Sequence, residues 1–445
     1  MEGSDLAPLL TPEGWRLLDA LPPYDPNEAL RLGDSLRREG HSPALVAAAL
    51  TQQRLRQRAV AKFGDFANRM LLTPDGLEQA TRLAVAAHHA ARYARAGVQH
   101  VADLGCGIGG DAMALASLCP QVLAVERDEP TAALATVNLS PFPNVQVRCA
   151  DALELDLGAQ GVDAVFADPA RRSGGRRIPD PERWSPPLSR VLALREQVEA
   201  LGIKVSPGID HALLPADSHV QWVSVDGGVV EAGIWCGPLA PEGPGRSALV
   251  LRSGDDGEPV AHTLTDPDCT SPAAPPVQLD PVAGQGALEA YIHEPDGAAI
   301  RAGLISHLAQ RLGARPVGHR IAYLTGPTPP PTQLAPFVRS WRLVEVVPLH
   351  LKALRSRVRQ RGIGRLDIHA RGVDLSPDAL RASLRPRGDA AETWFLTRIG
   401  PRGAGESGRS PKGAVLVVEA AAAATGPTPT FPSPLPESHT VHPTP

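Results

Sequence analysis

Apolar residues change their spacing near position 97, which divides the chain into regions of different predicted structure. Before that point they recur every three or four positions, as in amphipathic helices. The segments predicted as helices are residues 28–38, 42–63 and 77–97. Ser42 with Pro43 is typical of a helix start, and Gly97 is typical of a helix stop. We therefore expect residues 1–96 to form a helical N-terminal region.

From Val98 onward, short apolar runs alternate with helical segments. The runs predicted as strands are Val98–Leu104, Val122–Glu126, Val145–Arg148, Ala164–Ala167 and Ile203–Ser206. The helical segments between them are residues 111–118, 130–139 and 187–201. This alternation predicts a parallel β-sheet covered by helices.

Three more strands are predicted with little sequence between them. They are Val220–Val225, Val229–Cys236 and Ala248–Arg252. Asp226-Gly227-Gly228 joins the first two and is a strong hairpin signal. Residues 97–253 are therefore expected to form an α/β domain with a Rossmann-like sheet that is parallel at first and ends in antiparallel strands.

The remaining chain is predicted to hold a linker, a second domain and a tail. Residues 254–280 are rich in Asp, Pro and Ser, which indicates an irregular linker. Residues 281–400 are expected to form an α+β domain, with a helix at 301–312 and strands at 343–347, 365–370 and 393–398. Residues 401–445 are predicted as a mostly disordered tail, in which residues 414–424 can still form one strand.

Composition narrows the class of protein. Of 445 residues, 43% are hydrophobic, which supports a sizeable core, and the net charge of −4 excludes a globally basic nucleic-acid packing protein. The five cysteines show no CxxC spacing and indicate reduced thiols in the cytoplasm. Residues 1–30 lack a signal-peptide pattern, and the sequence lacks an apolar run long enough to span a membrane.

A glycine-rich segment carries the strongest chemical signal. It runs Asp103-Leu104-Gly105-Cys106-Gly107-Ile108-Gly109-Gly110, between a predicted strand and a predicted helix. Such a turn lets a ligand approach the backbone closely, and the next helix presents free N–H groups. Its glycines also satisfy the GxGxxG of a dinucleotide site, so a nicotinamide-dependent oxidoreductase stays open on spacing alone. Asp103 favours a cationic amino group over a pyrophosphate, which it would repel.

Acidic residues follow the next three predicted strands. Glu126 ends the second strand, where an acid can accept both hydroxyls of a ribose, and Arg127 lies beside it. Asp151, with Ala152 beside it, follows the third strand and is placed for an adenine amino group. Asp168 closes the fourth strand. The carboxyl ends of parallel strands share one edge of a sheet, so we expect these acids to line one ligand crevice.

The order of these motifs resembles the class I S-adenosylmethionine-dependent methyltransferases over about residues 60–250. Thr73-Pro74-Asp75 resembles the entry motif of amino-group methyltransferases and of trimethylguanosine-synthase-like enzymes, which helps to hold the methionine end of the cofactor. Thr73 also fits a plain helix N-cap, and both roles are compatible. The resemblance implies S-adenosylmethionine as cofactor. The contacts it implies are Thr73, Asp103, Gly105, Gly107, Gly109, Glu126, Arg127, Asp151 and Ala152.

A wider set of motifs resembles a bacterial methyltransferase family with a C-terminal THUMP-like domain. In the first half they are Lys62-Phe63-Gly64, residues 77–81, residues 103–111 and Asp168-Pro169-Ala170-Arg171. In the second half they are residues 294–296, 300–304, 321–325, 362–364 and 371–372. THUMP domains elsewhere bind RNA, so the resemblance implies RNA (tRNA or rRNA) as the substrate.

Asp168 and the main-chain carbonyl of Pro169 are the candidate catalytic groups. Next to an exocyclic amine they would orient its lone pair and accommodate the positive charge that develops. Amino-group methyltransferases usually continue with a second proline and an aromatic residue that stacks on the base, whereas this chain continues with Ala170-Arg171. The target base and atom therefore stay open, and Asp168-Pro169 as a simple strand end is the alternative.

Basic and aromatic residues beside this motif are candidates for binding the substrate. They are Arg171, Arg172, Arg176 and Trp184. A second basic cluster over residues 352–365 suits either RNA or a solvated helix face, because arginine is frequent throughout this chain. Trp184 fits a core position equally well.

Some chemistries are disfavoured by the residues present. Uracil C5-methyltransferases attack with a cysteine after the next strand, where this chain has Lys204-Val205-Ser206. His88 and His89 lack a nearby Cys or acid in the sequence, so we expect no metal. We predict a monomeric RNA methyltransferase acting on a base amino group. The alternatives are a methyltransferase of small molecules or proteins, and a non-catalytic protein that binds S-adenosylmethionine and RNA.

Overall fold

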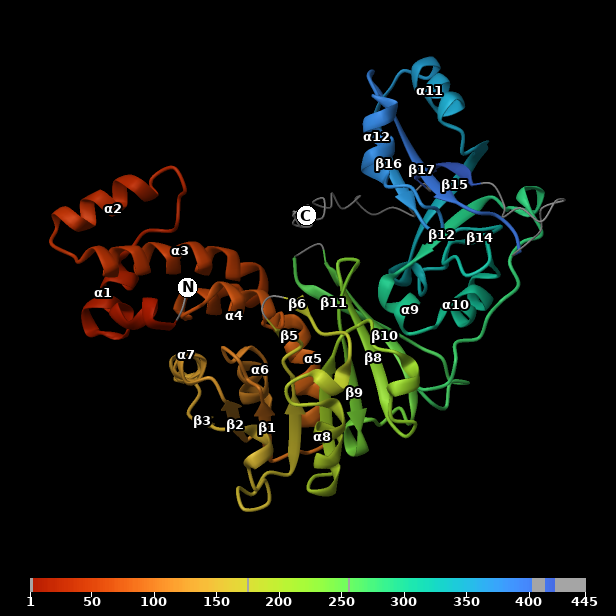
Figure 1. Ribbon diagram of the computed structural model, residues 1–445. Helices are drawn as coiled ribbons and strands as arrows, with labels where there is room; N and C mark the ends of the chain where they lie inside the picture. The colour runs from red at the N-terminus through yellow and green to blue at the C-terminus, as the bar shows by residue number, and fades with distance from the viewer. Residues whose placement is uncertain (1–2, 174–175, 255–256, 402–412, 421–445) are drawn as a thin grey trace, which may run out of the picture. The chain divides into compact units, whose positions relative to one another are not determined.

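The computed structural model describes residues 3–173, 176–254, 257–401 and 413–420 (Figure 1). It divides into two compact units. The first takes residues 1–278 and 295–308, and the second takes residues 279–294 and 309–445. Within the described residues, the first unit holds a nine-stranded sheet and the second a seven-stranded sheet.

The first unit opens with helices, as the apolar spacing predicts. They are a 3-10 helix at Gly3–Leu10, α1 at Pro12–Ala20, α2 at Ala29–Arg38, α3 at Pro43–Phe63, a 3-10 helix at Gly64–Arg69, α4 at Pro74–Gln79 and α5 at Leu83–Arg95. The same local signal starts three of them: a hydroxyl side chain followed by proline. Thr11, Ser42 and Thr73 each accept a hydrogen bond from a backbone N–H three residues later, at 3.0, 3.2 and 3.0 Å.

The single helix predicted over residues 77–97 is wrong, because the chain breaks between α4 and α5. Lys62, which lies earlier in the sequence on α3, stabilises the chain at this break. Its ammonium donates to the carbonyl oxygens of Leu77, Glu78 and Ala80 at 2.7–2.8 Å. These carbonyls lie at the C-terminal end of α4, where helical partners are missing.

The first sheet is built from the predicted alternating elements. Its strands are β1 at His100–Leu104, β2 at Gln121–Glu126, β3 at Val145–Cys149, β4 at Ala164–Ala167, β7 at Ala200–Val205, β8 at His219–Val225, β9 at Gly228–Cys236, β10 at Gly245–Ser253 and β11 at Pro259–Thr265. Their order is β11-β10-β8-β9-β7-β4-β1-β2-β3. Strands β3 to β7 in this order run parallel, and β9 is antiparallel to both β7 and β8. The predicted Rossmann-like sheet with antiparallel terminal strands is confirmed.

Helices cover this sheet and fill its core. They are α6 at Gly110–Leu118, α7 at Glu129–Leu139, α8 at Leu188–Leu192 and, from the later part of the chain, α9 at Gly297–Arg301, which packs against β8 and β10. In the interior between α5, β4 and β9, Phe166 stacks on Trp235 and Tyr93 contacts both rings edge-on. The hydroxyl of Tyr93 donates to the carbonyl of Val165 at 2.7 Å and so fixes α5 on the sheet.

Two predictions for the first unit need correction. The linker predicted over residues 254–280 contains β11, which pairs antiparallel with β10 at the sheet edge. Its residues are mostly exposed, so the apolar signal of a buried strand is missing. The helix predicted over residues 187–201 ends by Glu196, and its last part belongs to the buried strand β7. Apolar runs of this length do not distinguish a buried strand from a helix.

The second unit is a mixed sheet with helices. It contains β12 at Tyr291–Pro295, β13 at Arg315–Pro316, β14 at Leu324–Gly326, β15 at Val338–Pro348, α11 at Leu351–Gln360, β16 at Ile363–Ala370, α12 at Pro377–Leu384, β17 at Ala390–Thr397 and β18 at Ala414–Ala420. The strand order is β13-β14-β12-β15-β18-β17-β16. The predicted α+β architecture is confirmed.

The helix predicted over residues 301–312 is instead divided between α9 and α10, at Ile305–Leu312, by Gly303 in a left-handed conformation (φ +70°).

Strand β18 lies in the region predicted as a mostly disordered tail, at the place where one strand is expected within residues 414–424, and this strand is confirmed over residues 414–420. It lies between β15 and β17 and pairs antiparallel with both. Its residues Val415, Leu416, Val417 and Val418 are buried. The rest of the predicted tail, residues 402–412 and 421–445, lies outside the described residues.

Candidate active site

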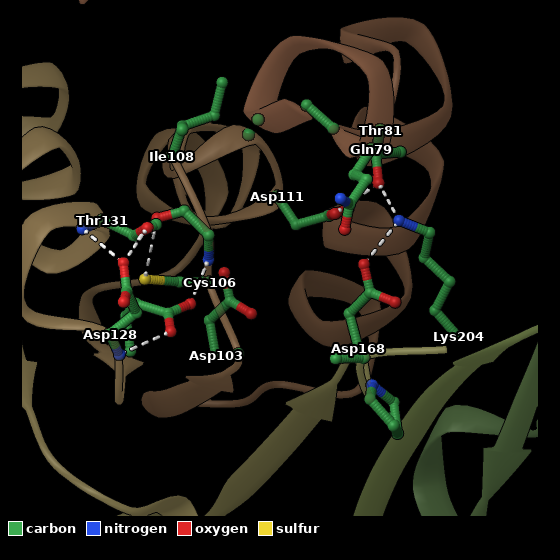
Figure 2. A pocket seen from close by; sticks show the side chains of 18 of the residues that line it. Gln79, Thr81, Asp103, Cys106, Ile108, Asp111, Asp128, Thr131, Asp168 and Lys204 are labelled. Atoms are coloured by element: carbon green, nitrogen blue, oxygen red, sulfur yellow. Dashed lines mark hydrogen bonds and ion pairs between the residues drawn. The ribbon is translucent and has the colours of Figure 1, made fainter. Parts of the chain in front are cut away.

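A cavity of about 1080 Å³ opens at the carboxyl ends of the parallel strands in the first unit (Figure 2). The ends of β1, β2, β3 and β4 contribute Asp103, Glu126, Asp151 and Asp168. Four acids that are separated by up to 65 positions in the sequence therefore face one cavity, as the sheet topology predicts. Thr73 and its neighbours line another side of it.

The glycine-rich turn lies between β1 and α6 and needs glycine for close backbone contacts. Gly105 has a φ of +85°, and a Cβ there would lie 2.9 Å from the carbonyl oxygen of Asp168. Gly107 has a φ of +55°, and its N–H donates to Glu126 Oε2 at 3.1 Å. Both glycines line the cavity. Gly109 does not line it: it is the N-cap of α6, and its Cα faces Leu139.

Asp103 is the most unusual group in the cavity. It lines the wall but is only 1% exposed, and neither carboxylate oxygen has a hydrogen-bond partner among the described residues. Burial raises its pKa well above the ordinary value, and the negative charges of Asp111 and Asp168 raise it further. A buried carboxylate without a partner is costly, so the site is built to receive a cationic or donor group there.

The other strand-end residues are already held by local hydrogen bonds. Glu126 accepts from the N–H groups of Gly107 and Asp128, which leaves further lone pairs on its carboxylate. Asp151 accepts from the N–H of Leu153 at 2.9 Å, and Ala152 lies beside it on the cavity wall. Arg127 lines the cavity but donates to the hydroxyl of Ser185 at 2.8 Å, on the loop after β4.

A chain of polar groups along the cavity wall reaches Asp168 (Figure 2). Lys204 on β7 donates to Asp168 Oδ2 at 2.6 Å and to the hydroxyl of Thr81 at 2.7 Å. Thr81 in turn donates to Asp111 Oδ2 at 2.5 Å. Asp111 on α6 also contacts His89 Nδ1 on α5 at 2.9 Å. The chain therefore ties α5, α6 and β7 to the end of β4.

His89 carries a positive charge within this chain. Its Nε2 lies 2.7 Å from Glu231 Oε1 on β9, an ion pair whose atoms are not aligned as a hydrogen bond. Burial alone would lower the pKa of His89, but Glu231 and Asp111 outweigh burial and raise it to about 10. Burial would likewise lower the pKa of Lys204, but Asp168, Asp111 and Glu231 raise it well above its ordinary value. Both bases are therefore cations at neutral pH.

Sequence reasoning found part of this chain. Lys204, in place of a cysteine, was interpreted as a residue that faces the cofactor or a phosphate, or as a solvated strand end, and His89 was interpreted as a solvated or packed histidine. His89 is indeed buried and packed, 5.1 Å from the ring of Phe166, yet it is also ion-paired. Thr81 and Asp111 appeared only within family motifs. Glu231 gave no signal, because its partners lie far away in the sequence.

The candidate substrate-binding residues differ in where they lie relative to the cavity. Arg171 lines the cavity, with Nη2 3.7 Å from Asp168 Oδ1. Arg172 and Arg176 lie on β5 (Arg172–Ser173) and β6 (Arg176–Arg177), a short hairpin whose side chains lie outside the described residues. Trp184 does not line the cavity. It is 3% exposed, and its indole N–H donates to the carbonyl of Ile178, so the loop packs around it and it is not free to stack on a base.

Two expected absences concern ligands and membranes. Among the described residues, no group of three or more His, Cys, Asp or Glu side chains is arranged to hold a metal ion. None of the helices in the described part of the chain is long and apolar enough to cross a membrane.

Comparison with known proteins identifies parts of the chain. Family models match a domain of unknown function at residues 3–59, a methyltransferase domain at residues 101–173 and a THUMP-like domain at residues 338–407. A crystal structure from Porphyromonas gingivalis W83, described as that of a candidate methyltransferase, has a TM-score of 0.65 at 19% identity. The match covers 89% of this chain and 99% of that chain, and at this identity it shows a shared fold.

Relatives of higher identity extend over most of the chain. Two proteins of Mycobacterium tuberculosis, from strains CDC 1551 / Oshkosh and H37Rv, are each named as an uncharacterized S-adenosylmethionine-dependent methyltransferase. Each is 32% identical over 374 residues, which is 81% of this chain and 93% of the relative. The chain belongs to the family of S-adenosylmethionine-dependent methyltransferases and carries a THUMP-like domain in its C-terminal part.

Proposed function

We propose that this methyltransferase acts on RNA and transfers the methyl group of S-adenosylmethionine to an amino group of a nucleobase. One observation carries the proposal: Asp103, whose carboxylate has no hydrogen-bond partner among the described residues, and the candidate acceptor Asp168 face the same cavity. The first is suited to hold the cofactor, and the second is suited to meet the group that receives the methyl.

The residues around the cavity fit S-adenosylmethionine. This cofactor carries an ammonium group and a sulfonium, and the buried Asp103 carboxylate lacks a partner of its own among the described residues. We assign Asp103 to the amino group, Glu126 to the ribose hydroxyls, and Asp151 with Ala152 to the adenine. Thr73 lies on the cavity wall and is assigned to the methionine end.

Two other proposed cofactor residues take narrower roles. Gly109 shapes the turn at the start of α6 and does not face the cavity. Arg127 is assigned to the cavity rim, where it ties the end of β2 to Ser185 on the loop after β4.

The chemistry of the cofactor is the supply of an electrophilic methyl group on sulfur. When bound, the cofactor would give this methyl group to a nitrogen lone pair: the new C–N bond would form as the C–S bond breaks, the electron pair of that bond would stay on sulfur, and the nitrogen would release one proton to solvent. The protein's contribution is to align the acceptor and exclude water, and Asp168 with the Pro169 carbonyl can accept the N–H bonds that orient the amine.

An RNA substrate is supported by the THUMP-like domain and by basic residues near the cavity. Arg171 lines the cavity beside Asp168, and the hairpin that carries Arg172 and Arg176 follows directly. Guanidinium groups there suit phosphate contacts and base stacking. In the second unit, Arg357 of the predicted basic cluster is engaged by Glu345 and Glu392 and so does not belong to a free basic face.

Mass spectrometry of modified nucleosides tests the proposal. RNA from a strain that lacks the gene should lose one methylated nucleoside, and the purified full-length protein with S-adenosylmethionine should restore it. An unchanged set of nucleosides, together with methylation of a protein or a small molecule, would reject the RNA substrate. Tight binding of S-adenosylhomocysteine with no methyl transfer to any RNA would instead support a non-catalytic protein.

A further inference from the structure

We infer that Lys204 and Asp168 act together as a donor–acceptor pair that selects a nucleobase edge with an amino group next to an unprotonated ring nitrogen, as in adenine, in cytosine and at N2 and N3 of guanine. This inference rests on the proposed function and narrows its substrate class. Asp168 would accept from the amino group while Lys204 donates to the ring nitrogen. Lys204 is thus assigned as a specificity-determining residue.

The first step is the free hydrogen-bonding capacity of Lys204. An ammonium has three N–H donors, and among the described residues two are engaged, by Asp168 Oδ2 at 2.6 Å and by Thr81 at 2.7 Å. Lys204 is only 4% exposed, yet it lines the cavity. The third donor is therefore available to a ligand in this cavity and not to bulk solvent.

The second step is that the direction of these hydrogen bonds is fixed. The hydroxyl of Thr81 has one proton, which it gives to Asp111, so it can only accept from Lys204. Asp111 is held in place by His89, which is itself ion-paired with Glu231. Lys204 is therefore held rigidly as a donor and is not placed to take a proton from a substrate.

The third step concerns Asp168. One of its oxygens, Oδ2, accepts from Lys204, whereas Oδ1 lies 3.7 Å from Arg171, beyond hydrogen-bond distance. The cavity thus presents an acceptor, Asp168 Oδ1, beside a donor, the third N–H of Lys204. A ligand that complements both must present a donor next to an acceptor.

Known base edges can be sorted by this requirement. Adenine places an amino group beside N1, cytosine places one beside N3, and guanine places its 2-amino group beside N3, and all three ring nitrogens are acceptors. An aliphatic amine, such as a protein lysine, is a cation at neutral pH and would be repelled by the buried Lys204 ammonium. The same pair therefore argues against a protein amine as the acceptor.

The test compares natural and modified bases in RNA. The methylated position is first located by mass spectrometry, using RNA from a strain that lacks the gene. Oligonucleotides that span this position are then made with the natural base and with the matching analogue, 1-deazaadenosine, 3-deazacytidine or 3-deazaguanosine, which keeps the amino group but replaces the ring acceptor by C–H. The full-length wild-type protein should methylate the natural base about 10- to 100-fold faster, as expected for one lost hydrogen bond to a charged donor.

The variant Lys204→Met separates recognition from a structural role. It should methylate both oligonucleotides slowly and at nearly the same rate, while calorimetry shows that it still binds S-adenosylhomocysteine. A merely structural lysine would slow both reactions but keep the ratio between them. Lys352→Met, an exposed lysine of α11, is the matched control and should keep the wild-type ratio.

The results that overturn the inference are distinct from those that overturn the proposed function. Equal wild-type rates on the natural and the deaza base, or a ratio that persists in Lys204→Met, would reject the role of Lys204. Methylation of uracil, of a ring nitrogen or of ribose would reject the selected edge but keep an RNA substrate. Failure of the wild-type protein to methylate any RNA would reject both.

Discussion

At the scale of single residues, Asp103 combines a cost for folding with a gain for binding. Its buried carboxylate lacks a hydrogen-bond partner among the described residues, and burial, with the charges of Asp111 and Asp168, raises its pKa. A group whose pKa is higher in the folded state stabilises the fold less as the pH rises. The buried charge therefore lowers the stability of the free protein, and a bound ammonium group would offset this cost.

Replacing Asp103 by asparagine should stabilise the free protein and abolish cofactor binding. The neutral amide has nearly the same shape and removes a buried charge, so the free energy of unfolding should rise by about 1–2 kcal/mol at pH 8. The gain should shrink at pH 5, where the wild-type carboxyl is more fully protonated. Urea unfolding at both pH values measures stability, and calorimetric titration with S-adenosylhomocysteine measures binding.

The exposed Asp65 on the 3-10 helix Gly64–Arg69 provides the matched control, and Asp65→Asn should change neither quantity measurably. An Asp103→Asn protein that binds S-adenosylhomocysteine with wild-type affinity would remove Asp103 from the cofactor site.

Asp168 gives a contrasting prediction, because it is assigned to the acceptor and not to the cofactor. Asp168→Asn keeps an oxygen that can face Lys204 but loses the negative charge. It should retain affinity for S-adenosylhomocysteine and lose turnover by about 100-fold or more, as for other preorganised electrostatic groups. Single-turnover assays of methyl transfer to RNA measure this, and an active variant would place the acceptor elsewhere.

At the scale of elements, the sequence predicted the parts of the fold that local patterns determine. The parallel strands are continuous apolar runs because both of their faces are buried, so Ala164–Ala167 was located correctly from the sequence alone. The glycine turn and the acids at the strand ends were located correctly as well, because each directly follows a predicted strand. The mostly exposed edge strand β11 has no such apolar run, and the break between α4 and α5 is stabilised by the distant Lys62.

The candidate site, like the fold, could be predicted only where local sequence patterns determine it. Strand topology alone brings Asp103, Glu126 and Asp168 to one cavity, so their meeting was predictable. The chain from Lys204 through Thr81 to His89 was not, because its members lie on elements far apart in sequence, and a lone histidine or lysine gives no sign of its partners.

Strand β18 gives a prediction at this scale. It is a central strand of the second sheet with four buried apolar residues, so a chain that ends at residue 401 should lose the fold of the second unit. The loss of this burial is worth more than about 5 kcal/mol. Limited proteolysis should cleave the second unit rapidly in the 1–401 chain. A chain that ends at residue 420 keeps β18 and should resist, and equal resistance of both would contradict a structural role for this strand.

His369 on β16 makes the second unit sensitive to alkaline pH. It contacts Glu294 on β12 at 3.3 Å and Asp367 at 3.1 Å. Burial lowers its pKa, but these carboxylates outweigh burial and raise it to about 9. Its contribution to stability, about 1–3 kcal/mol, should therefore be complete below about pH 6.5 and lost as the pH rises through 9.

The variant His369→Gln should lack this loss between pH 7 and pH 9.5, as measured by thermal unfolding of the second unit. His319→Gln, which changes an exposed histidine of the same unit, should keep the wild-type pH dependence. A wild-type second unit whose stability is constant over this range would contradict the ion-paired state of His369.

At the scale of the whole molecule, the two compact units separate the proposed tasks. Every residue that lines the cavity belongs to the first unit, whereas the matched THUMP-like domain belongs to the second. With a net charge of −4, the chain as a whole does not attract RNA, so binding must depend on local basic groups. The affinity of these basic groups for RNA should fall steeply with salt. Cofactor binding should involve the first unit alone, because the cavity lies there.

S-adenosylhomocysteine should therefore stabilise one unit and leave the other unchanged. A ligand that binds only the folded form adds about 2.7 kcal/mol at 100 times its Kd, which corresponds to a shift of a few degrees in a unit of this size. Differential scanning calorimetry of the full chain should show two transitions, of which one moves with the ligand.

Asp103→Asn should abolish this shift, and His369→Gln should change the other transition only. NAD⁺ should move neither, because the Asp103 carboxylate repels a pyrophosphate. If both transitions moved together with S-adenosylhomocysteine, the cofactor site would not belong to the first unit alone.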